Sequence, residues 1–374
     1  MEFDFSAEQK QLKEQVRRFL SDQCDRKAVR AILDGPQPYD QKLWKGLGDL
    51  GYLGASIPET YGGLGLGYLE ACVIAEELGR AVAPVPFCSS IALAAECLLL
   101  AGTDQQKEQH LPPLARGEAV ATLAIAEGTG RVTAESIRTQ ASMANGHWTL
   151  TGKKLAVLDG DISDIAIVAA THQTAVSLFL VDLRQVSVQR ESLRTIDPTR
   201  SHGNIQFNSA PAALLGKPGE AWTLLEQVYD RAAVLIAFEQ LGLADRALEM
   251  GRDYALERFA FGRPIGSLQA IKHMLADMYV SATLARSNCY YGAWALSTNS
   301  SELPVAAATA RVSTTQGSQH CTRNNIQVHG GMGFTWEFDC HLYYRRANLL
   351  AVNIGALSLW EDRLIQKMRP RQAA

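Results

Sequence analysis

One acidic residue stands in an otherwise apolar helical pattern and is a candidate for proton transfer. Ala232, Ile236, Glu239 and Leu243 are spaced by four, three and four residues, so a helix places them on one face. A carboxylate on an apolar face is costly unless it is paired or functional, and burial raises its pKa towards that of a useful base. Glu239 is therefore predicted to be either a general base or a structural carboxylate, hydrogen-bonded to a neighbouring helix or to Arg246.

Two segments of the C-terminal third contain residues that suit an anionic ligand. A predicted helix carrying Arg258 breaks at Gly262-Arg263-Pro264, and the next helix begins near Gln269. The planar, permanently charged guanidinium of arginine suits phosphate oxygens. The glycine-rich turn from Gln327 to Phe334 follows another helix, and such a turn offers backbone N–H groups to a pyrophosphate or an adenosine. Taken alone, the segments also fit a helical hairpin with a solvated arginine and a plain glycine helix cap.

Several well-known motifs are absent or stand in the wrong context. Gly46 to Gly51 matches the dinucleotide pattern GxGxxG, but it follows a helix-like stretch and runs into Pro58. That motif needs a preceding strand and a following helix. No Walker loop, HExxH or GxSxG motif occurs. His329 and His341 lie twelve residues apart without a matching pair of ligands, so both are predicted to be structural and no metal is expected.

The composition excludes several classes of protein. With 47% hydrophobic and 20% charged residues, the chain of 374 residues is predicted to be soluble and globular. A net charge of −3 disfavours nucleic-acid binding. The seven cysteines are scattered, which argues against a disulfide framework and for a reducing compartment. No membrane span is predicted and Met1 to Ser6 has no leader pattern, so a cytoplasmic location is expected.

The elements that must position these residues change in type along the chain. Helical periodicity, introduced by a capping signal at Ser6, gives way near residue 119 to short apolar or alternating runs and returns from Ala221. The prediction is a mainly α chain with a central β domain, divided into residues 1–118, 119–220 and 221–374. Strands are expected at 121–125, 148–151, 165–170, 176–181 and 203–207, and early helices at 39–50, 69–78, 91–101 and 105–115.

Four motifs occur in a characteristic order: Pro58 to Gly65, Glu76-Glu77-Leu78-Gly79-Arg80, Arg258 to His273 and Gln327 to Phe334. On these motifs the chain resembles the acyl-CoA dehydrogenases along nearly its whole length. The resemblance implies an N-terminal helical domain, a central β-barrel and a C-terminal four-helix bundle. It also implies bound FAD, usually in a tetramer that is a dimer of dimers.

The resemblance assigns binding roles to particular residues. The positions that match the family's FAD contacts are Arg258, Phe261 and Gln269, for the pyrophosphate and adenosine across the dimer interface, and Gln327, Gly330 and Gly331, for the second subunit's adenine-side loop. Asp230 and Arg231 match the start of the helix that contacts the pantetheine arm of the CoA thioester. The arginine usually found three residues after that aspartate is Ala233 here.

The chain departs from the family at the flavin. The barrel motif usually written Thr-Glu-Pro-x-x-Gly-Ser-Asp begins Ala126-Glu127, and the strand that usually presents Trp-Ile-Thr ends in Leu158. Ala126 and Leu158 therefore occupy the cofactor-binding positions without the usual side chains.

The chain also departs from the family at the catalytic base. Both usual positions of the catalytic glutamate are apolar, since they are Ile354 and Ala232, and the usual Arg-Asp-Ala has Arg346 in place of the aspartate. Glu239 is the remaining candidate for the base. It lies about 10 Å beyond Ala232 along the helix, at about 1.5 Å per residue, so the thioester would have to sit deeper.

The reaction that the resemblance implies is α,β-dehydrogenation of an acyl-CoA thioester to the 2-enoyl-CoA. A carboxylate removes the α-proton, the flavin accepts the β-hydride, and an electron-transfer flavoprotein takes the electrons; an acyl-CoA oxidase is open on the same scaffold. The alternative is a catalytically incomplete subunit that supplies FAD-binding elements to a partner chain, like relatives that act on steroid side-chain CoA esters. Homotetramer and heterotetramer both remain open, and the net charge disfavours the DNA-associated flavoproteins of this fold.

Overall fold

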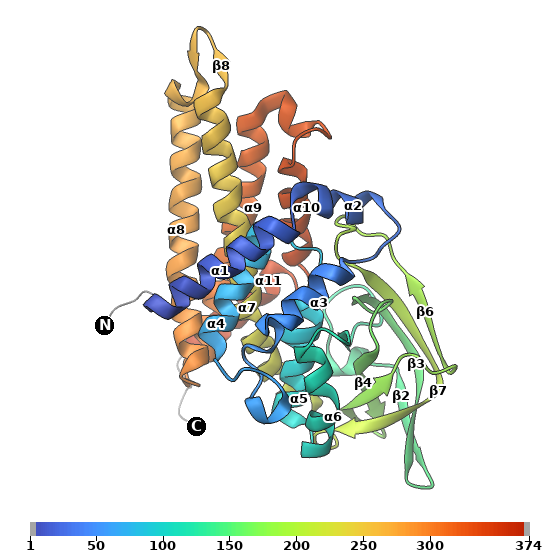
Figure 1. Ribbon diagram of the computed structural model, residues 1–374. Coiled ribbons are helices and arrows are strands. Elements are labelled where there is room, and N and C mark those ends of the chain that lie inside the picture. The colour runs from blue at the N-terminus through green and yellow to red at the C-terminus, as the bar shows by residue number, and fades with distance from the viewer. Residues whose placement is uncertain (1–4, 370–374) are drawn as a thin grey trace. The chain divides into compact units, whose positions relative to one another are not determined.

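The computed structural model describes residues 5–369 (Figure 1). Contacts divide the chain into two compact units, each discontinuous in sequence. The helical unit comprises Met1–Arg30, Tyr68–Ala83 and Ala233–Ala374, and the barrel unit comprises Ala31–Gly67 and Pro84–Ala232. Residues 1–4, which belong to the stretch Met1 to Ser6 predicted to have no leader pattern, lie outside the described residues. None of the helices within residues 5–369 combines the length and apolar content that a bilayer crossing needs.

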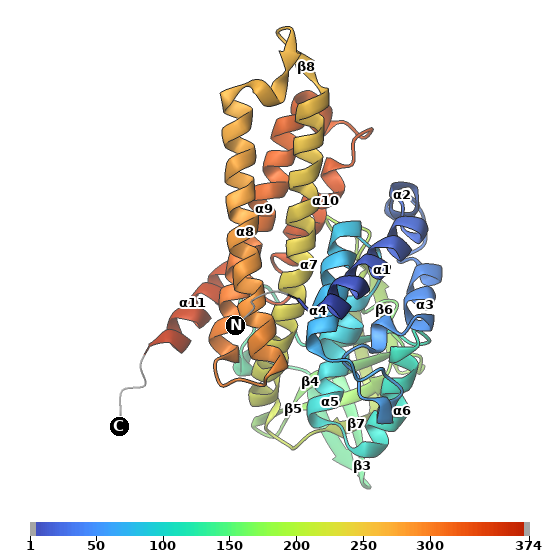
Figure 2. The ribbon, with the colours of Figure 1, turned by 60° about the vertical axis from the view of Figure 1, so that its left-hand side comes forward.

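Three long helices form the centre of the helical unit (Figures 1 and 2). They are the part of α7 (Ala221–Glu257) from Ala233 onward, α8 (Gln269–Ser297) and α9 (Leu303–His329). The other helices are α1 (Ala7–Gln23), α4 (Tyr68–Ala81), α10 (Cys340–Leu350) and α11 (Leu357–Met368). The hairpin of β8 (Phe259–Ala260) and β9 (Arg263–Pro264) and the 3-10 turn Ile265–Ser267 join α7 to α8. Small core residues let the three long helices pack closely, and Met278 fills the space between them: the small residues are Ala244, Ala247, Ala282 and Cys321.

Helix α4 crosses α7 so closely that each helix needs a glycine at the crossing. A Cβ on Gly79 would lie 1.9 Å from the backbone oxygen of Glu239, and a Cβ on Gly242 would lie 1.9 Å from that of Glu76. This contact is a physical reason for the glycine in the motif Glu76-Glu77-Leu78-Gly79-Arg80.

The charged residues of the same motif tie α4 to α1, α7 and α8. Glu76 is 2% exposed and pairs with Lys13 at 2.7 Å and with Arg286 at 3.1 Å. Glu77 pairs with Arg17 of α1, and Arg80 with Glu249 of α7. The motif therefore acts through packing and ion pairs within the helical unit.

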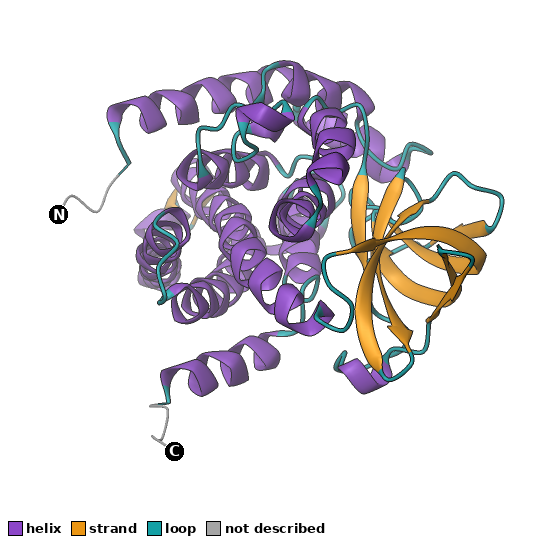
Figure 3. Ribbon diagram, turned by 90° about the horizontal axis from the view of Figure 1, so that it is seen from below, coloured by secondary structure: helices purple, strands orange, loops and turns teal. Residues whose placement is uncertain are grey.

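The barrel unit contains a closed sheet (Figure 3). Strands pair in the order β4-β2-β3-β7-β5, and β5 pairs back onto β4, while β1 pairs with β4 and β6 with β7 outside this ring. The strands are β1 (Ala121–Ala124), β2 (Gln140–Ala144), β3 (His147–Leu158), β4 (Ile165–His172), β5 (Ala175–Asp182), β6 (Val188–Ser192) and β7 (His202–Leu215). Inward-facing apolar residues such as Val168, Phe179 and Phe207 fill the interior.

Short helices complete the barrel unit. They are α2 (Arg26–Asp34) from Ala31 onward, α3 (Gln41–Asp49), α5 (Glu96–Ala101) and α6 (Asp104–Ala115), with a π-helical stretch at Cys88–Ala95 and 3-10 turns at Tyr52–Gly54, Glu59–Tyr61 and Ala134–Ser136. The segment Gly46 to Gly51 lies at the end of α3 and in the turn after it, so its rejection as a dinucleotide motif is confirmed. The predicted helix over 91–101 is only partly right, because its first half is π-helical.

The predicted fold class is confirmed. A capping box joins Ser6 and Gln9 at the start of α1, and the five expected strands are present. Strands β2 and β6 were not predicted, because β2 has one buried residue, Ala141, and β6 has none, so neither shows an apolar pattern. The division into residues 1–118, 119–220 and 221–374 stays a prediction.

Candidate functional site

A pocket of about 440 Å³ brings together three of the predicted FAD-binding residues, Arg258, Gly330 and Gly331. Its other lining residues are Tyr254, Ile265, Val328, His329 and Met332, so all of it belongs to the helical unit. The segments that the sequence singled out, 72 residues apart, therefore meet at one site.

The chain reaches this pocket through two helix ends. Arg258 follows the last residue of α7 and donates its backbone N–H to Tyr254, and the chain returns along the hairpin so that Ile265 donates to the backbone oxygen of Arg258. Helix α9 ends at His329 and is capped by Gly330, whose φ of +60° favours glycine. A Cβ on Gly330 or Gly331 would have no atom within 4 Å, so the backbone here is open to a ligand.

An aromatic cluster supports the glycine turn. The rings of Tyr254 and His329 stack with centroids 4.1 Å apart, and Phe338 packs edge-on against both. His329 Nδ1 lies 2.8 Å from the backbone oxygen of Asn325, and since a carbonyl only accepts, Nδ1 carries the proton. Burial lowers the pKa of His329. His329 has the structural role predicted for it, and it also lines the pocket, which the sequence did not indicate.

The other three predicted FAD residues lie outside the pocket lining. Phe261 is 92% exposed at the hairpin between β8 and β9, with a φ of +55°. Gln269 is the first residue of α8, Gln327 lies in the last turn of α9, and both are exposed. An apolar ring with this exposure is typical of a surface that a ligand or another chain covers.

The predicted flavin-facing residues of the barrel unit have no polar side chains, so they offer backbone groups only. The backbone oxygen of Ala126 accepts from Leu155 at 2.8 Å, and that of Leu158 accepts from the Thr122 hydroxyl at 2.6 Å. The neighbouring Glu127, the residue retained from the family's barrel motif, pairs at 2.5 Å with Lys154. Lys154 is fully buried, and this burial lowers its pKa to about 8.

The predicted pantetheine residues lie in the first part of α7, within the barrel unit. Asp230 is 5% exposed. Arg231 Nη1 lies 3.8 Å from a carboxylate oxygen of Glu96, which is 1% exposed. Asp230 is thus buried and Arg231 lies beside a buried carboxylate, and their role towards CoA stays a prediction.

Glu239 is buried, as predicted, and its carboxylate contacts a guanidinium. It is 1% exposed, and its Oε1 lies 3.3 Å from Nη1 of Arg346, a fully buried residue of α10. The same nitrogen donates to the backbone oxygen of Ala83 at 3.2 Å. The partner is thus on a neighbouring helix, whereas Arg246 pairs with Glu249 at 3.1 Å. The role of Glu239 as a base stays a prediction.

The two positions that the resemblance matches to the family's catalytic glutamate have no proton acceptor in their side chains. Ala232 is fully buried and Ile354 is 5% exposed. The backbone oxygen of Ile354 accepts from Trp360 Nε1 at 3.1 Å, which fixes the turn after α10. Across residues 5–369, no group of three or more side chains of the metal-binding types gathers at one point.

Comparisons with known proteins agree on one family. The family model described as acyl-CoA dehydrogenase, N-terminal domain, matches residues 6–118, and that described as acyl-CoA dehydrogenase, C-terminal domain, matches residues 219–357. The acyl-CoA dehydrogenase IpdE2 of Mycobacterium tuberculosis is 32% identical over 91% of each chain. A variant of the Tcur3481–Tcur3483 steroid ACAD is 30% identical, with a TM-score of 0.87 over 96% of this chain and 97% of that one. The ChsE4–ChsE5 complex from Mycobacterium tuberculosis gives 26% identity and a TM-score of 0.90 over 99% of this chain and all of that one.

Proposed function

Because the chain belongs to the acyl-CoA dehydrogenase family, we propose that it binds FAD and takes part in the α,β-dehydrogenation of an acyl-CoA thioester. The observation that carries the proposal is the pocket in which Arg258 faces the same space as the open backbone of Gly330 and Gly331. The binding roles that the family resemblance assigns stay proposals for Phe261, Gln269, Gln327, Ala126, Leu158, Asp230 and Arg231.

The residues present fit part of this cofactor. Arg258 is exposed and supplies a permanent positive charge for a pyrophosphate, and the two glycines leave room for an approach to the backbone. The Tyr254–His329 stack suits the neighbourhood of a planar adenine. FAD, when bound, supplies the acceptor for the hydride from the β-carbon.

Removal of the α-proton is the step for which this chain has no evident residue. Neither Ile354 nor Ala232 can accept the α-proton, and Glu239 contacts Arg346. We therefore favour a heteromer in which an unlike, related subunit contributes the carboxylate. The Tcur3481–Tcur3483 steroid ACAD and the ChsE4–ChsE5 complex each pair two different chains, which supports this arrangement.

A second candidate is a self-sufficient homotetramer in which Glu239 is the base. The observation that favours it is the burial of this carboxylate on the apolar face of α7. In both candidates an electron-transfer flavoprotein is the proposed electron acceptor, and the cytoplasm is the proposed location.

The test is anaerobic reduction of the flavin with short, branched and steroid acyl-CoAs. It is run on the chain alone and on the chain co-expressed with each other acyl-CoA dehydrogenase chain of its own genome. We expect bleaching only in a mixed complex; bleaching by the chain alone would select the homomeric candidate. Protein that stays colourless after FAD is added, alone and in every combination, would reject the proposal.

Arg258→Ala tests the pocket itself. It removes charge-assisted hydrogen bonds of about 1.5–3 kcal/mol each, so FAD affinity should fall about 10- to 150-fold. Arg252→Ala is the matched control, since Arg252 is an exposed arginine of the same helix that pairs with Asp253 at 2.6 Å. Equal FAD affinity of the two variants would show that Arg258 does not contribute to FAD binding.

A further inference from the structure

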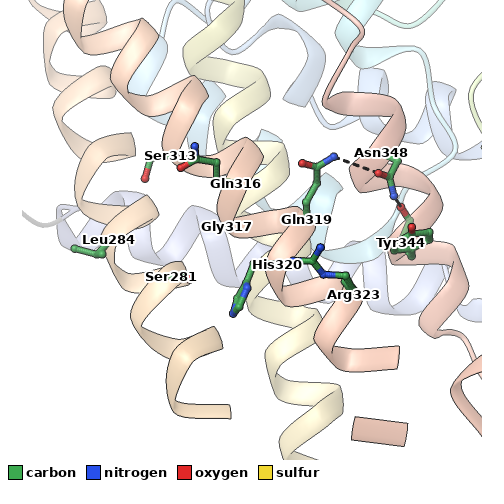
Figure 4. A pocket seen from close by; sticks show the side chains of 10 residues that line it. All are labelled: Ser281, Leu284, Ser313, Gln316, Gly317, Gln319, His320, Arg323, Tyr344 and Asn348. Atoms are coloured by element: carbon green, nitrogen blue, oxygen red, sulfur yellow. Dashed lines mark hydrogen bonds between the residues drawn. The ribbon is translucent and has the colours of Figure 1, made fainter. Parts of the chain in front are cut away.

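The larger hollow of the helical unit contains amide groups that already have partners. It has a volume of about 510 Å³ and lies over α9, between α8 and α10 (Figure 4). Gln319 donates to Asn348 at 3.2 Å, and Gln316 donates to Glu361 of α11 at 3.3 Å. Among its lining residues, all of which the structure describes, none has a buried polar atom without a partner. A stronger indication of function lies in the barrel unit, where two opposite charges are buried together.

The buried charges are Lys154 of β3 and Glu127, which directly follows the predicted flavin-facing residue Ala126. The side chain of Lys154 is fully buried and that of Glu127 is 8% exposed. Lys154 Nζ donates to Glu127 Oε1 at 2.5 Å and to the backbone oxygen of Ile125 at 3.0 Å. The backbone N–H of Leu155 donates to the oxygen of Ala126 at 2.8 Å. These bonds fix Ala126 relative to the strand that ends at the other predicted flavin-facing position.

The same carboxylate also binds the chain eleven residues further on. Glu127 Oε2 accepts the backbone N–H of Arg138 at 2.6 Å, and Oε1 accepts that of Thr139 at 3.0 Å. One side chain at the start of residues 128–137, named here the 128–137 loop, therefore holds the residues that follow its end. Burial opposes the charged form of Glu127, but the hydrogen bond and charge of Lys154 and the N–H of Thr139 outweigh it and hold the pKa of Glu127 below its ordinary value.

The end of the 128–137 loop is fixed to the barrel, but its first residues are open. Thr171 of β4 donates its hydroxyl to the backbone oxygen of Ile137 at 3.1 Å. In contrast, a Cβ on Gly128 or Gly130 would have no atom within 4 Å. An open backbone between fixed ends is typical of a loop that binds a ligand.

Burial alone does not explain the bonds from Glu127 to the loop. Arg138 is exposed, so water could satisfy its N–H in the absence of the carboxylate. A buried ion pair often adds no stability over apolar residues of similar volume. The bonds to Arg138 and Thr139 do, however, determine where the 128–137 loop runs beside Ala126.

We propose that Glu127 is a positioning residue, whose carboxylate holds the 128–137 loop in the conformation that binds FAD. The inference rests on the FAD binding proposed above and names the residue that shapes the barrel side of that site. Lys154 supplies the charge that keeps the carboxylate in place. Loss of the bonds would open the loop, and the apparent affinity for FAD would fall with the fraction of molecules in which the loop is closed.

Glu127→Gln tests the proposal, because glutamine has one acceptor oxygen and an amide donor where the carboxylate has two acceptors. Hydrogen exchange of residues 128–139, measured by mass spectrometry on the assembled protein without FAD, should become about tenfold faster or more. The affinity of the assembled protein for FAD should fall about tenfold. Glu135→Gln is the matched control, since it removes the same charge from the exposed 3-10 turn of the same loop and should change neither quantity.

A double variant separates positioning from stability. Glu127→Gln with Lys154→Met removes both buried charges, so the melting temperature should return towards that of the parent. Loop exchange and FAD affinity should stay at the values of Glu127→Gln, because the carboxylate is still absent. Phe207→Leu, in the barrel interior, should lower the melting temperature without changing loop exchange or FAD affinity.

Several results would contradict the proposal. Parent-like FAD affinity in Glu127→Gln, with or without faster exchange, would overturn it, and so would recovery of FAD affinity in the double variant. Equal effects of Glu135→Gln or Phe207→Leu would also overturn it. A parent that binds no FAD would instead overturn the proposed function, while hydrogen exchange would still show whether Glu127 closes the loop.

Discussion

Replacing Glu239 by glutamine separates a structural carboxylate from a catalytic one. The substitution keeps the shape of the side chain but removes the negative charge 3.3 Å from the buried guanidinium of Arg346. Breaking one side of a buried ion pair costs about 3–5 kcal/mol, and glutamine should fall near the lower end because it still accepts a hydrogen bond. We therefore expect Glu239→Gln to lower the free energy of unfolding by about 3 kcal/mol.

A double-mutant cycle isolates the pair. Arg346→Met should cost at least as much as Glu239→Gln, because it leaves the carboxylate buried beside an apolar side chain. The double variant Glu239→Gln with Arg346→Met removes both charges, and its loss of stability should be much smaller than the sum of the losses of the two single variants. The control is Arg246 with Glu249, a pair whose side chains are 32% and 30% exposed, where the same cycle should give about 0–1 kcal/mol.

The assay combines urea unfolding, followed by tryptophan fluorescence, with anaerobic flavin reduction of the folded mixed complex. If the carboxylate is structural, Glu239→Gln unfolds at lower urea but reduces flavin at the parent rate. The opposite result, unchanged stability with flavin reduction abolished, would refute the ion-pair reasoning. It would also establish Glu239 as the base that the sequence suggested.

Three further predictions follow from the described contacts. Gly79→Ala puts a Cβ 1.9 Å from the backbone oxygen of Glu239 and should lower the free energy of unfolding in urea by about 3 kcal/mol or more. Gly128→Ala is the control, because its Cβ would have no atom within 4 Å, and it should change the free energy of unfolding by less than about 0.5 kcal/mol. Burial lowers the pKa of His329 in the folded chain, so as the pH falls the unfolded chain binds the proton before the folded chain does. The free energy of unfolding therefore decreases as the pH falls below the ordinary histidine pKa of about 6.5. Melting temperatures at pH 7.5 and 5.5 should therefore differ less for His329→Phe than for the parent, and an equal difference would count against this. Phe261→Ser should leave the melting temperature unchanged but weaken the retention of FAD by the assembled protein on gel filtration. Unchanged retention would show that Phe261 at this hairpin does not contribute to FAD binding.

Much of the fold was predictable because its signals are local. The capping box of Ser6 and Gln9 depends on residues three apart, and the apolar runs of β4 and β5 are buried along most of their length. Strands β2 and β6 escaped prediction because their side chains face solvent, so only pairing with β3 and β7 makes them strands. The π-helical stretch at Cys88–Ala95 was not predicted, because an apolar run in the sequence does not distinguish a π-helix from an α-helix.

The pocket proposed for FAD was predictable only in part. Arg258 and the two glycines have side-chain or backbone properties that point to an anion, and the order of the motifs linked them. Tyr254 and Phe338 carry no such signal in the sequence, since an aromatic residue near a helix end is usually part of a core. Tyr254 stacks on His329 and Phe338 packs edge-on against it. Tyr254 and His329 are 75 positions apart, so only the folded helices create this contact.

Two departures from the family that looked separate in the sequence become one compensated change in the structure. Arg346 stands where the family usually has an aspartate, and Glu239 interrupts an apolar stripe, 107 residues earlier. Each alone would bury an unmatched charge, but together they form an ion pair at the point where α4 and α7 cross. The ion pair gives Glu239 a structural role that does not depend on the apolar residue at Ile354, and its role as the base stays a prediction. In the proposed heteromer a carboxylate of another subunit would take the α-proton, so the mixed complex is the form in which activity should first be sought.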